Sequence, residues 1–360
     1  MNNSKILFVM PTLKKDGAEV QIANLISYFK HFQIDIFTFD LYKEGDSIIN
    51  QLDGIKIFTN HGLSTIVSLN KVINENNYKI VHSHLPKADF YVGLLKFFGN
   101  KFNHIITVHA QYGDRTGESK IKYFIFNIFW KVFLNKSDGI IAISQKINKW
   151  LTNNKSIVEN KIATIHYGIK IDKQIKKINN KKIVGMAARM LPWKGWDKVI
   201  ETASILNELN PNYKFLLAGS DDQNYKSELQ DLIENKNLVD MVLLHDHYSN
   251  IEEFFSKIDL FLFLSESEGF GLVVLEAIQN NTPVVCSNIE PLSEFVDNSH
   301  GTLVDRNNVQ EIANLISSIF SSDELLNKIQ TKQKNKIVKE FSIISTAKKY
   351  ENYYINLLNN

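Results

Sequence analysis

One stretch of the chain has the pattern of a strand, a loop, a helix and a second strand, and this order restricts the folds open to it. Residues 260–264 form an apolar run, a loop with two glycines follows, and a helical pattern ends near residues 280–281. Residues 282–286 have the pattern of the next strand. Two strands joined by a helix in this way are parallel neighbours in a sheet with helices on its faces. The sequence therefore predicts an α/β fold.

The loop of this unit has the features of an anion site. Gly269 and Gly271 let the backbone approach a ligand closely. The helix behind them begins with unpaired N–H groups, which favour a negatively charged partner. Glu268 precedes the helix, and Glu276 is expected about two turns into it. Carboxylates beside an anion site can accept hydrogen bonds from neutral hydroxyls, so a nucleotide-sugar fits this loop.

The segment from Glu268 to Glu276 resembles the Glu-x7-Glu signature of retaining glycosyltransferases of the family-4 type. The resemblance implies the GT-B fold, in which two Rossmann-like parallel-sheet domains face each other across a cleft. It implies that Glu268 contacts hydroxyls of the donor sugar and that Glu276 binds the ribose. It also implies that the amides around Phe270, Gly271 and Leu272 lie beside the sugar and the diphosphate. A core helix preceded by a glycine-containing turn is the alternative interpretation.

Two more positions in the second half match the same family. Arg189 and Lys194 lie in a loop that follows a strand pattern and precedes a helix expected from Trp196 to about Glu208. By resemblance they bind the nucleotide diphosphate, and a guanidinium with an ammonium can neutralise a leaving diphosphate without a metal ion. No Asp-x-Asp motif is present, so we expect neither a metal nor a cofactor. Gly219, near the end of another strand, is expected to pass close to the nucleotide.

The first half begins with a buried type of strand at residues 6–10, and the loop after it leads into a helix through about Lys30. The family has small residues in this loop, near the donor phosphate and the acceptor. Here Gly17 is kept, while Asp16 occupies the position of a first glycine. The resemblance implies a ligand contact at Gly17, and an ordinary turn glycine is the alternative.

Histidines lie at the ends of two further predicted strands. His82 and His84 are two residues apart on a strand, so their side chains share one face. A metal pair is one interpretation, but no third ligand follows at a characteristic spacing, which favours structural or acceptor-side contacts. His109 matches the family's Thr-x-His position at a strand end, where open α/β sheets bind ligands. The resemblance implies that His109 stabilises the reacting sugar and leaving diphosphate, or holds the acceptor.

The charge is distributed unevenly along the chain. The formal net charge of the 360 residues is +2, but residues 118–182 carry 14 lysines against four acidic residues, a local +10. Residues 119–136 interleave aromatic rings with lysines at spacings that a helix can present, and such a helix could lie at an anionic membrane surface. The alternative is a helix packed on the sheet with its lysines extended over the rim. The nearly continuous apolar positions favour a largely buried helix.

The single cysteine, Cys286, excludes an internal disulfide framework, and its apolar setting indicates packing rather than a reactive thiol. The N-terminus has the pattern of a first strand rather than of a secretion signal. No uninterrupted apolar run reaches the ~18 residues of a spanning helix. We expect a cytoplasmic protein that lies at most peripherally on the inner face of the cytoplasmic membrane.

We expect two domains, because 360 residues exceed the ~100–200 typical of one domain. The polar, basic segment 173–182 has the composition of a linker. This places an N-terminal acceptor-side domain at 1–172 and a C-terminal nucleotide-sugar donor domain at 173–340. A helical pattern covers 309–326. By resemblance, a final helix within 341–360 crosses back to the first domain.

Together these features predict a metal-independent, retaining glycosyltransferase that moves a hexose or N-acetylhexosamine from a nucleotide diphosphate sugar to an acceptor hydroxyl. Retention is taken from the resemblance. The expected acceptor is a growing or lipid-linked glycan of a surface polysaccharide such as lipopolysaccharide or capsule. Another GT-B activity such as a nucleotide-sugar epimerase, or a non-catalytic nucleotide-sugar-binding protein, is the alternative. Nucleic acid is not an expected partner, because the basic segment lacks a recognition motif and is poor in arginine.

Overall fold

The chain forms two compact units, one of which is built from two separate stretches of sequence. The first unit is Met1–Gly168 with Ile343–Asn360, and the second is Ile169–Ser342. The acceptor and donor roles assigned to the two halves stay predictions. The structure, a computed structural model, describes residues 4–41, 47–60, 64–111, 128, 130–171 and 181–359.

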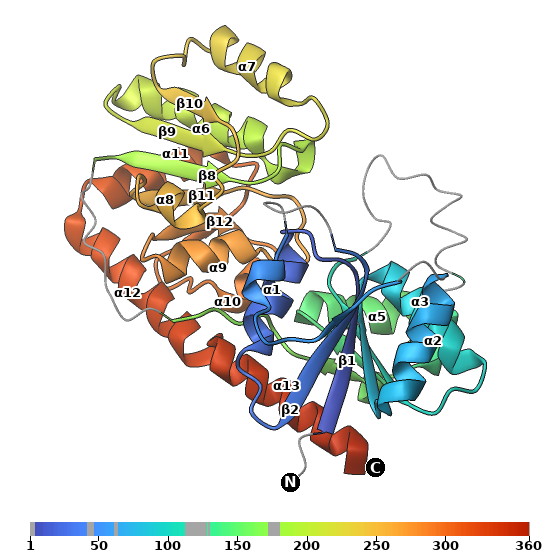
Figure 1. The fold of residues 1–360 in the computed structure, drawn as a ribbon. Helices are drawn as coiled ribbons and strands as arrows, with labels where there is room; N and C mark the ends of the chain where they lie inside the picture. The colour runs from blue at the N-terminus through green and yellow to red at the C-terminus, as the bar shows by residue number, and fades with distance from the viewer. Residues whose placement is uncertain are drawn as a thin grey trace. The chain divides into compact units, whose positions relative to one another are not determined.

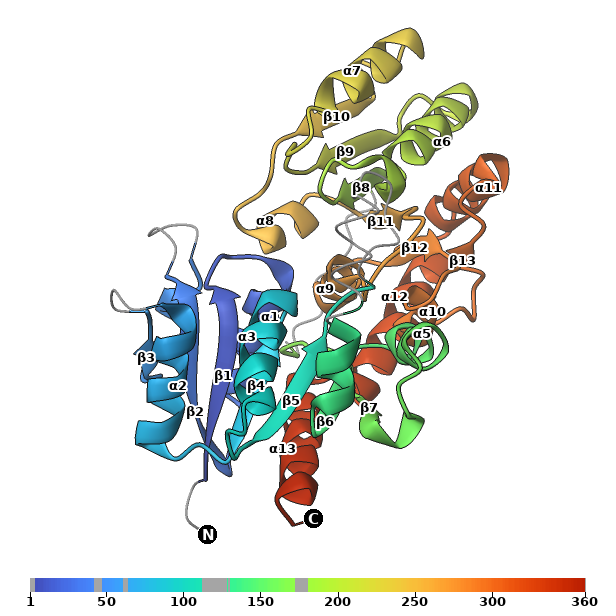
Figure 2. The same cartoon turned by 90° about the vertical axis from the view of Figure 1, so that its right-hand side faces the viewer.

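Within the described residues, the first unit contains a seven-stranded parallel sheet in the order β3-β2-β1-β4-β5-β6-β7 (Figure 2). β1 lies inside the sheet, where Ile6 faces Ile34 of β2 and Ile80 of β4. Its central residues are fully buried, as expected for a parallel strand covered on both faces. The strands are β1 (Ser4–Thr12), β2 (Phe32–Asp40), β3 (Ile57–Phe58), β4 (Ile80–His84), β5 (Asn103–Val108), β6 (Gly139–Ala142) and β7 (Ile162–Thr164).

The first helix of this unit is shorter than predicted. It ends at Ile26 rather than near Lys30, and the next turn is tighter, because Tyr28 and Phe29 donate to carbonyls three residues back. The N–H groups of Lys30 and the following residue donate instead to a carboxylate on the last helix. The helices are α1 (Gly17–Ile26), η1 (Ile49–Gln51), α2 (Thr65–Asn76), α3 (Pro86–Phe97), α5 (Gln145–Lys155), η2 (Glu159–Lys161) and α13 (Ile343–Asn359).

The C-terminal helix α13 completes the core of the first unit. It contacts α1, and Ile343, Ala347, Tyr350 and Tyr354 are buried in the same apolar cluster as the first strands. The hydroxyl of Tyr354 lies 2.8 Å from Nδ1 of His82 on β4. The Tyr354 ring of α13 contacts the Phe32 ring at the start of β2, with centroids 5.5 Å apart, and Figure 1 shows the end of α13 and the start of β1 at the same end of this unit.

The second unit contains a six-stranded parallel sheet, in the described residues, with the order β10-β9-β8-β11-β12-β13. Its first strand, β8, therefore lies between β9 and β11, and the chain leaves β8 in one direction and returns on its other side. The prediction of an α/β fold with two parallel sheets is confirmed. The strands are β8 (Ile183–Ala187), β9 (Lys214–Ala218), β10 (Val242–His245), β11 (Leu260–Phe263), β12 (Val284–Ser287) and β13 (Leu303–Val304).

The predicted continuous helix at 309–326 is wrong, because two helices occupy this region. The hydroxyl of Ser322 accepts a hydrogen bond from the N–H of Leu325 and caps a new helix. In the described part of the chain, no helix is both long and apolar enough to span a membrane. The helices of this unit are η3 (Pro192–Lys194), α6 (Trp196–Leu209), α7 (Lys226–Asn235), α8 (Ile251–Phe255), α9 (Leu272–Gln279), α10 (Leu292–Phe295), α11 (Val309–Phe320) and α12 (Asp323–Glu340).

Candidate functional site

The strand order of the second sheet brings two of the predicted loops to one place. From β8 the chain continues to β9 and β10 on one side of β8, and it then returns to form β11 on the other side of β8. The boundary between β8 and β11 is therefore a topological switch point. In open α/β sheets, ligands bind outside the carboxyl ends of strands at such a point. Arg189 and Lys194 follow β8, and Glu268 follows β11. These predicted site residues therefore lie on the two loops that border the switch point.

The two loops are joined by an ion pair and by backbone hydrogen bonds. Nζ of Lys194 lies 2.5 Å from Oε1 of Glu268, and the two side chains are only 15% and 10% exposed. The carbonyl of Trp193 accepts a hydrogen bond of 2.8 Å from the N–H of Glu266. Partial burial strengthens the attraction between the two charges relative to bulk water. The sequence predicted both side chains as site residues but gave no indication that they pair.

A glycine allows the loop after β8 to pack against the end of β11. Gly195 has a φ of 82°, between the turn at η3 and the start of α6. A Cβ at this position would overlap the carbonyl of Leu264, so the close approach requires glycine. The indole N–H of Trp196 donates to the carbonyl of Arg189 over 3.0 Å, which fixes the loop from the helix side. The Arg189 side chain itself is exposed.

The helix behind Glu268 begins later than the sequence pattern predicts. Gly271, with a φ of 88°, precedes α9, and the first helical residue is Leu272. Glu276 therefore lies about one turn into the helix, and the predicted two turns are wrong. The Phe270 ring is buried and stacks on the Phe295 ring, with centroids 5.2 Å apart. Its side chain thus belongs to the core, and a role of its amide towards a ligand stays a prediction.

The carboxyl group of Glu276 has an unusual acidity. Burial raises its pKa to about 7, because the surrounding protein disfavours the charged form. Near neutral pH this group can therefore exist with or without its proton. Either form can accept a hydrogen bond from a ligand hydroxyl, which is the chemistry implied by the resemblance.

Gly219 lies in a tight contact between the ends of β8 and β9. A Cβ there would overlap the carbonyl of Ala188, and the Gly219 N–H donates to the carbonyl of His245 over 3.3 Å. Packing thus gives this glycine a structural reason to be present. The expected proximity to the nucleotide stays a prediction.

Gly17 and His109 belong to the first unit, whereas the other predicted site residues belong to the second. Gly17 is the exposed first residue of α1, in the connection that follows β1. Two residues later Glu19 is buried, and burial raises the pKa of its carboxyl group. The hydroxyl of Thr12 donates to this carboxyl group over 3.4 Å. A ligand contact at Gly17 stays a prediction.

His109 directly follows β5 and is held from both sides. Its Nδ1 contacts the hydroxyl of Tyr167, and its Nε2 lies 3.2 Å from Nδ1 of His84. The rings of His82 and His84 stack with centroids 4.2 Å apart, as their shared strand face predicts. Burial lowers the pKa of His109 to about 3 and that of His84 well below its usual value, so both rings are neutral at pH 7. In the ranges that the structure describes, no group of three or more His, Cys, Asp or Glu is arranged to hold a metal ion.

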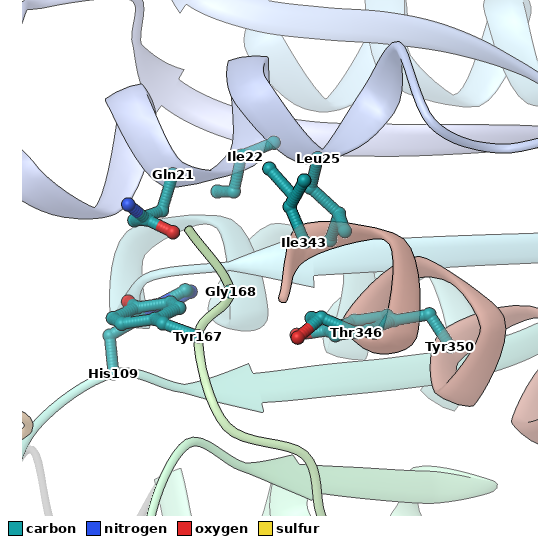
Figure 3. Close-up of a pocket in the computed structure, with 9 residues that line it drawn as sticks. All are labelled: Gln21, Ile22, Leu25, His109, Tyr167, Gly168, Ile343, Thr346 and Tyr350. Carbon is teal, nitrogen blue, oxygen red and sulfur yellow. The ribbon is translucent and has the colours of Figure 1, made fainter. Parts of the chain in front are cut away.

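A small pocket lies beside His109 and Tyr167 within the first unit (Figure 3). Its volume of about 10 Å³ has room for about one water molecule. Sequence reasoning missed Tyr167 as a partner of His109, since 58 positions separate them. The helix α13 contributes one wall of the pocket, which no local pattern could indicate. The lining residues are Gln21, Ile22 and Leu25 of α1, His109, Tyr167 and Gly168, and Ile343, Thr346 and Tyr350 of α13.

The basic aromatic segment predicted at 119–136 lies partly outside the described residues, which omit 112–127 and 129. Residues 130–136 are helical, and Trp130 and Phe133 are buried. Ile128 and Val132 are exposed. The described part of this segment therefore has one face in the core and exposed apolar side chains as well.

Cys286 is buried, and burial raises the pKa of its thiol, in agreement with a packing role.

Two models of glycosyltransferase families match the chain in succession. Residues 15–173 match Glycosyltransferase Family 4, and residues 169–336 match Glycosyl transferases group 1. Between them they cover most of both units. The first match lies on the part of the chain that carries Gly17 and His109, and the second on the part that carries Arg189, Lys194 and the two glutamates.

Individual proteins agree with these matches. The chain is 30% identical to a poly(ribitol-phosphate) alpha-N-acetylglucosaminyltransferase of Staphylococcus aureus, over 71% of this chain and 50% of that protein. The chain thus spans half the length of this relative. It is 27% identical to the O-antigen biosynthesis glycosyltransferase WclY of Escherichia coli over 98% of each chain. The crystal structure of Anabaena Alr3699/HepE in complex with UDP has a TM-score of 0.82 and 19% identity, over 98% of this chain and 100% of that one, which shows a shared fold.

Proposed function

Because the chain belongs to the glycosyltransferases described by these two family models and has their GT-B fold, we propose that it is a retaining, metal-independent hexosyltransferase. Its donor is a nucleotide diphosphate sugar, and the transferred group is a hexose or an N-acetylhexosamine. The observation that carries this proposal is the pairing of Lys194 with Glu268 at the switch point of the second sheet. This pair places a cation suited to a diphosphate next to a carboxylate suited to sugar hydroxyls.

Donor binding would replace the ion pair with two ligand contacts. The diphosphate binds the ammonium of Lys194, and hydroxyls of the sugar donate hydrogen bonds to the carboxylate of Glu268. Neither charge is then left unpaired in a largely buried position, which would be costly. Glu276, about one turn into α9, accepts a hydrogen bond from the ribose.

In the proposed reaction, the acceptor hydroxyl attacks the anomeric carbon on the face from which the diphosphate departs. The bond between the anomeric carbon and the phosphate oxygen breaks, a new bond to the acceptor oxygen forms, and the acceptor proton passes to the leaving diphosphate. Arg189 and Lys194 stabilise the negative charge that develops on the diphosphate. Losing one such electrostatic contact typically raises the barrier by ~3–4 kcal/mol. His109 stabilises the reacting sugar or holds the acceptor.

We expect Lys194→Ala and Arg189→Ala each to lower kcat by roughly 100-fold or more while the protein still folds, with a lower melting temperature in Lys194→Ala because Glu268 loses its partner. Calorimetric titration with UDP-, GDP- and dTDP-sugars, in the presence of EDTA, identifies the donor class. UDP-sugars are tested first, because the Anabaena relative was crystallised with UDP. Wild-type turnover in both variants, or a requirement for a divalent cation, would contradict the mechanism.

Product analysis separates this proposal from its alternatives. A retaining transferase gives a product whose anomeric configuration matches the donor, which the coupling constant of the anomeric proton reveals by NMR. Inversion would contradict the proposed stereochemistry. A nucleotide-sugar epimerase would instead consume the donor without any acceptor, and a non-catalytic binding protein would bind the donor without turnover.

The proposed acceptor is a growing or lipid-linked glycan of a bacterial surface polysaccharide. Support comes from the relatives, whose names refer to O-antigen biosynthesis and to poly(ribitol-phosphate). An acceptor assay with undecaprenyl diphosphate-linked saccharides tests the lipid-linked class. Transfer to free oligosaccharides at the same rate as to the lipid-linked saccharides would argue against a lipid-linked acceptor.

We also propose that the protein acts in the cytoplasm, at the inner face of the membrane. In the first unit Phe97 and Phe98 are 61% and 73% exposed at the end of α3, and Ile128 and Val132 are exposed as well. With the excess of lysines in 118–182, these side chains suit an anionic lipid surface. Flotation with anionic liposomes should show binding that weakens as salt is added. No salt-sensitive binding would remove the support for this location.

A further inference from the structure

A third segment of the second unit reaches the loop that follows β11. Arg306, two residues after β13, directs its guanidinium to this loop. Its Nε donates a hydrogen bond of 3.0 Å to the carbonyl of Leu264. Its Nη1 lies 3.2 Å from Oε2 of Glu266. The arginine side chain is 17% exposed, whereas that of Glu266 is 65% exposed, so the carbonyl contact is the better protected of the two.

The carbonyl of Leu264 is a meeting point of three segments. Leu264 is fully buried at the end of β11. Gly195, in the turn before α6, approaches the same carbonyl so closely that a Cβ would overlap it. Arg306 binds the carbonyl from the segment after β13. A hydrogen bond from a charged donor to a buried carbonyl is stronger than one between neutral groups.

Both residues of the ion pair are close in sequence to the segments that meet at this carbonyl. Lys194 immediately precedes Gly195, and Glu268 follows Leu264 by four positions. Between them, the N–H of Glu266 donates to the carbonyl of Trp193. A displacement of the Leu264 carbonyl would therefore move both loops and the separation of their charged groups.

We propose that Arg306 is a positioning residue for the Lys194–Glu268 pair. It holds the end of β11 against the turn at Gly195. This contact fixes the position of the Lys194 ammonium relative to the departing diphosphate. The catalytic part of this inference rests on the proposed function of the pair. The mechanical part concerns the resting protein and is testable without any substrate.

The shape of arginine suits this role better than that of lysine. One planar guanidinium can donate through Nε to the carbonyl while Nη1 reaches a carboxylate. A lysine ammonium is a compact point charge without a planar fork, so it cannot bind the Leu264 carbonyl and the Glu266 carboxylate with the same geometry. Arg306→Lys should therefore keep the charge and lose much of the positioning.

The first experiment measures the reactivity of Lys194 in the full-length protein. Competitive acetylation with acetic anhydride, followed by mass spectrometry, gives the modification rate of this lysine. We expect Arg306→Met to raise this rate several-fold, because the ion pair that shields the ammonium loosens. Glu268→Gln is the positive control, since it removes the partner of Lys194 directly. Glu266→Gln is the matched control, because it leaves the contact between Arg306 and the Leu264 carbonyl in place.

Kinetics with the donor then test the consequence for catalysis. Arg306→Met should lower kcat by about 10-fold or more, with a smaller change in KM for the donor, while Glu266→Gln stays close to the wild type. Arg306→Lys provides the same comparison if the methionine variant does not fold. An unchanged reactivity of Lys194 in a folded Arg306 variant would overturn the proposal, whatever the activity. A raised reactivity in a protein that binds no nucleotide diphosphate would support the positioning role and count against the proposed function instead.

Discussion

At the scale of single residues, Glu276 shows how burial changes the acidity of a carboxyl group in the proposed donor site. Its pKa is raised from 4.5 to about 7 by the surrounding protein. Between these two values the folded protein retains a proton that the unfolded chain has released. The favourable contribution of this group to the free energy of unfolding is therefore fully present below pH ~4.5 and is lost as the pH rises through ~7.

Replacing Glu276 with glutamine should remove this pH dependence. At pH 8 we expect Glu276→Gln to be more stable than the wild type by about 3 kcal/mol, because the charged carboxylate that the surrounding protein disfavours is absent. Near pH 4.5 the difference should vanish. Urea unfolding at both pH values measures it, with Glu208→Gln at an exposed position of α6 as a control. If the difference in the free energy of unfolding between Glu276→Gln and the wild type were the same at all pH values, the raised pKa of Glu276 would be contradicted.

The pair of Lys194 and Glu268 shows a second property of residues in this site. Each was predicted for what it does with a ligand, but in the resting protein each satisfies the other at 2.5 Å. Such pairing avoids an isolated charge in a largely buried position. In the proposed reaction, the same two groups exchange partners when the diphosphate and the sugar hydroxyls of the donor bind.

At the scale of elements, the C-terminal helix has the most far-reaching contacts in the first unit. Oε1 of Glu351 accepts hydrogen bonds from the N–H groups of Lys30 and His31, both at 2.6 Å. These groups follow the end of α1, where the chain has left the helix and has no carbonyl partners of its own. One carboxylate on α13 thus stabilises the end of a helix more than 300 positions earlier.

Glu351→Ala should therefore destabilise the first unit by about 2–3 kcal/mol, because two N–H groups lose a charged acceptor. Glu351→Gln keeps an acceptor oxygen and should lose about half as much. Urea unfolding followed by tryptophan fluorescence, to which Trp130 and Trp150 of this unit contribute, measures both effects. Equal stabilities of the alanine variant and the wild type would show that solvent replaces the carboxylate without loss.

At the scale of the whole molecule, the first unit depends on both ends of the chain. Its sheet and most of its helices come from residues 1–168, yet α13 contributes Tyr350 and Tyr354 to the buried core. The second unit, 169–342, has a sheet and a core within one continuous stretch. The two units should therefore respond differently to truncation.

We expect the fragment 169–342 to unfold cooperatively by itself. A chain that ends at Ser342 should retain this transition but lose that of the first unit, because removal of α13 exposes an apolar face and leaves His82 without its tyrosine partner. A peptide of residues 343–360, added in trans, should restore the missing transition. Circular dichroism on heating measures each case. A truncated chain with both transitions intact would contradict this prediction.

Much of the fold could be predicted from the sequence, because the signals are local. Apolar runs such as 260–264, followed by a glycine-containing loop and a helical pattern, predict parallel strands joined by helices, and the structure has them. The loops with Arg189, Lys194 and Glu268 were also identified from contiguous residues. Helix ends were predicted less well. The end of α1 and the break at Ser322 depend on a few specific hydrogen bonds that a pattern of apolar residues does not contain.

The sequence by itself determined the α/β class, the strand-loop-helix units and the chemical groups of the candidate site. Only the tertiary structure decided which of these groups meet. The contacts of Lys194 with Glu268, Tyr167 with His109 and Arg306 with Leu264 join residues that are 74, 58 and 42 positions apart. Local propensity acts over a few residues, whereas the order of strands in a sheet brings distant loops to one edge. For that physical reason the residue types could be predicted and their partners could not.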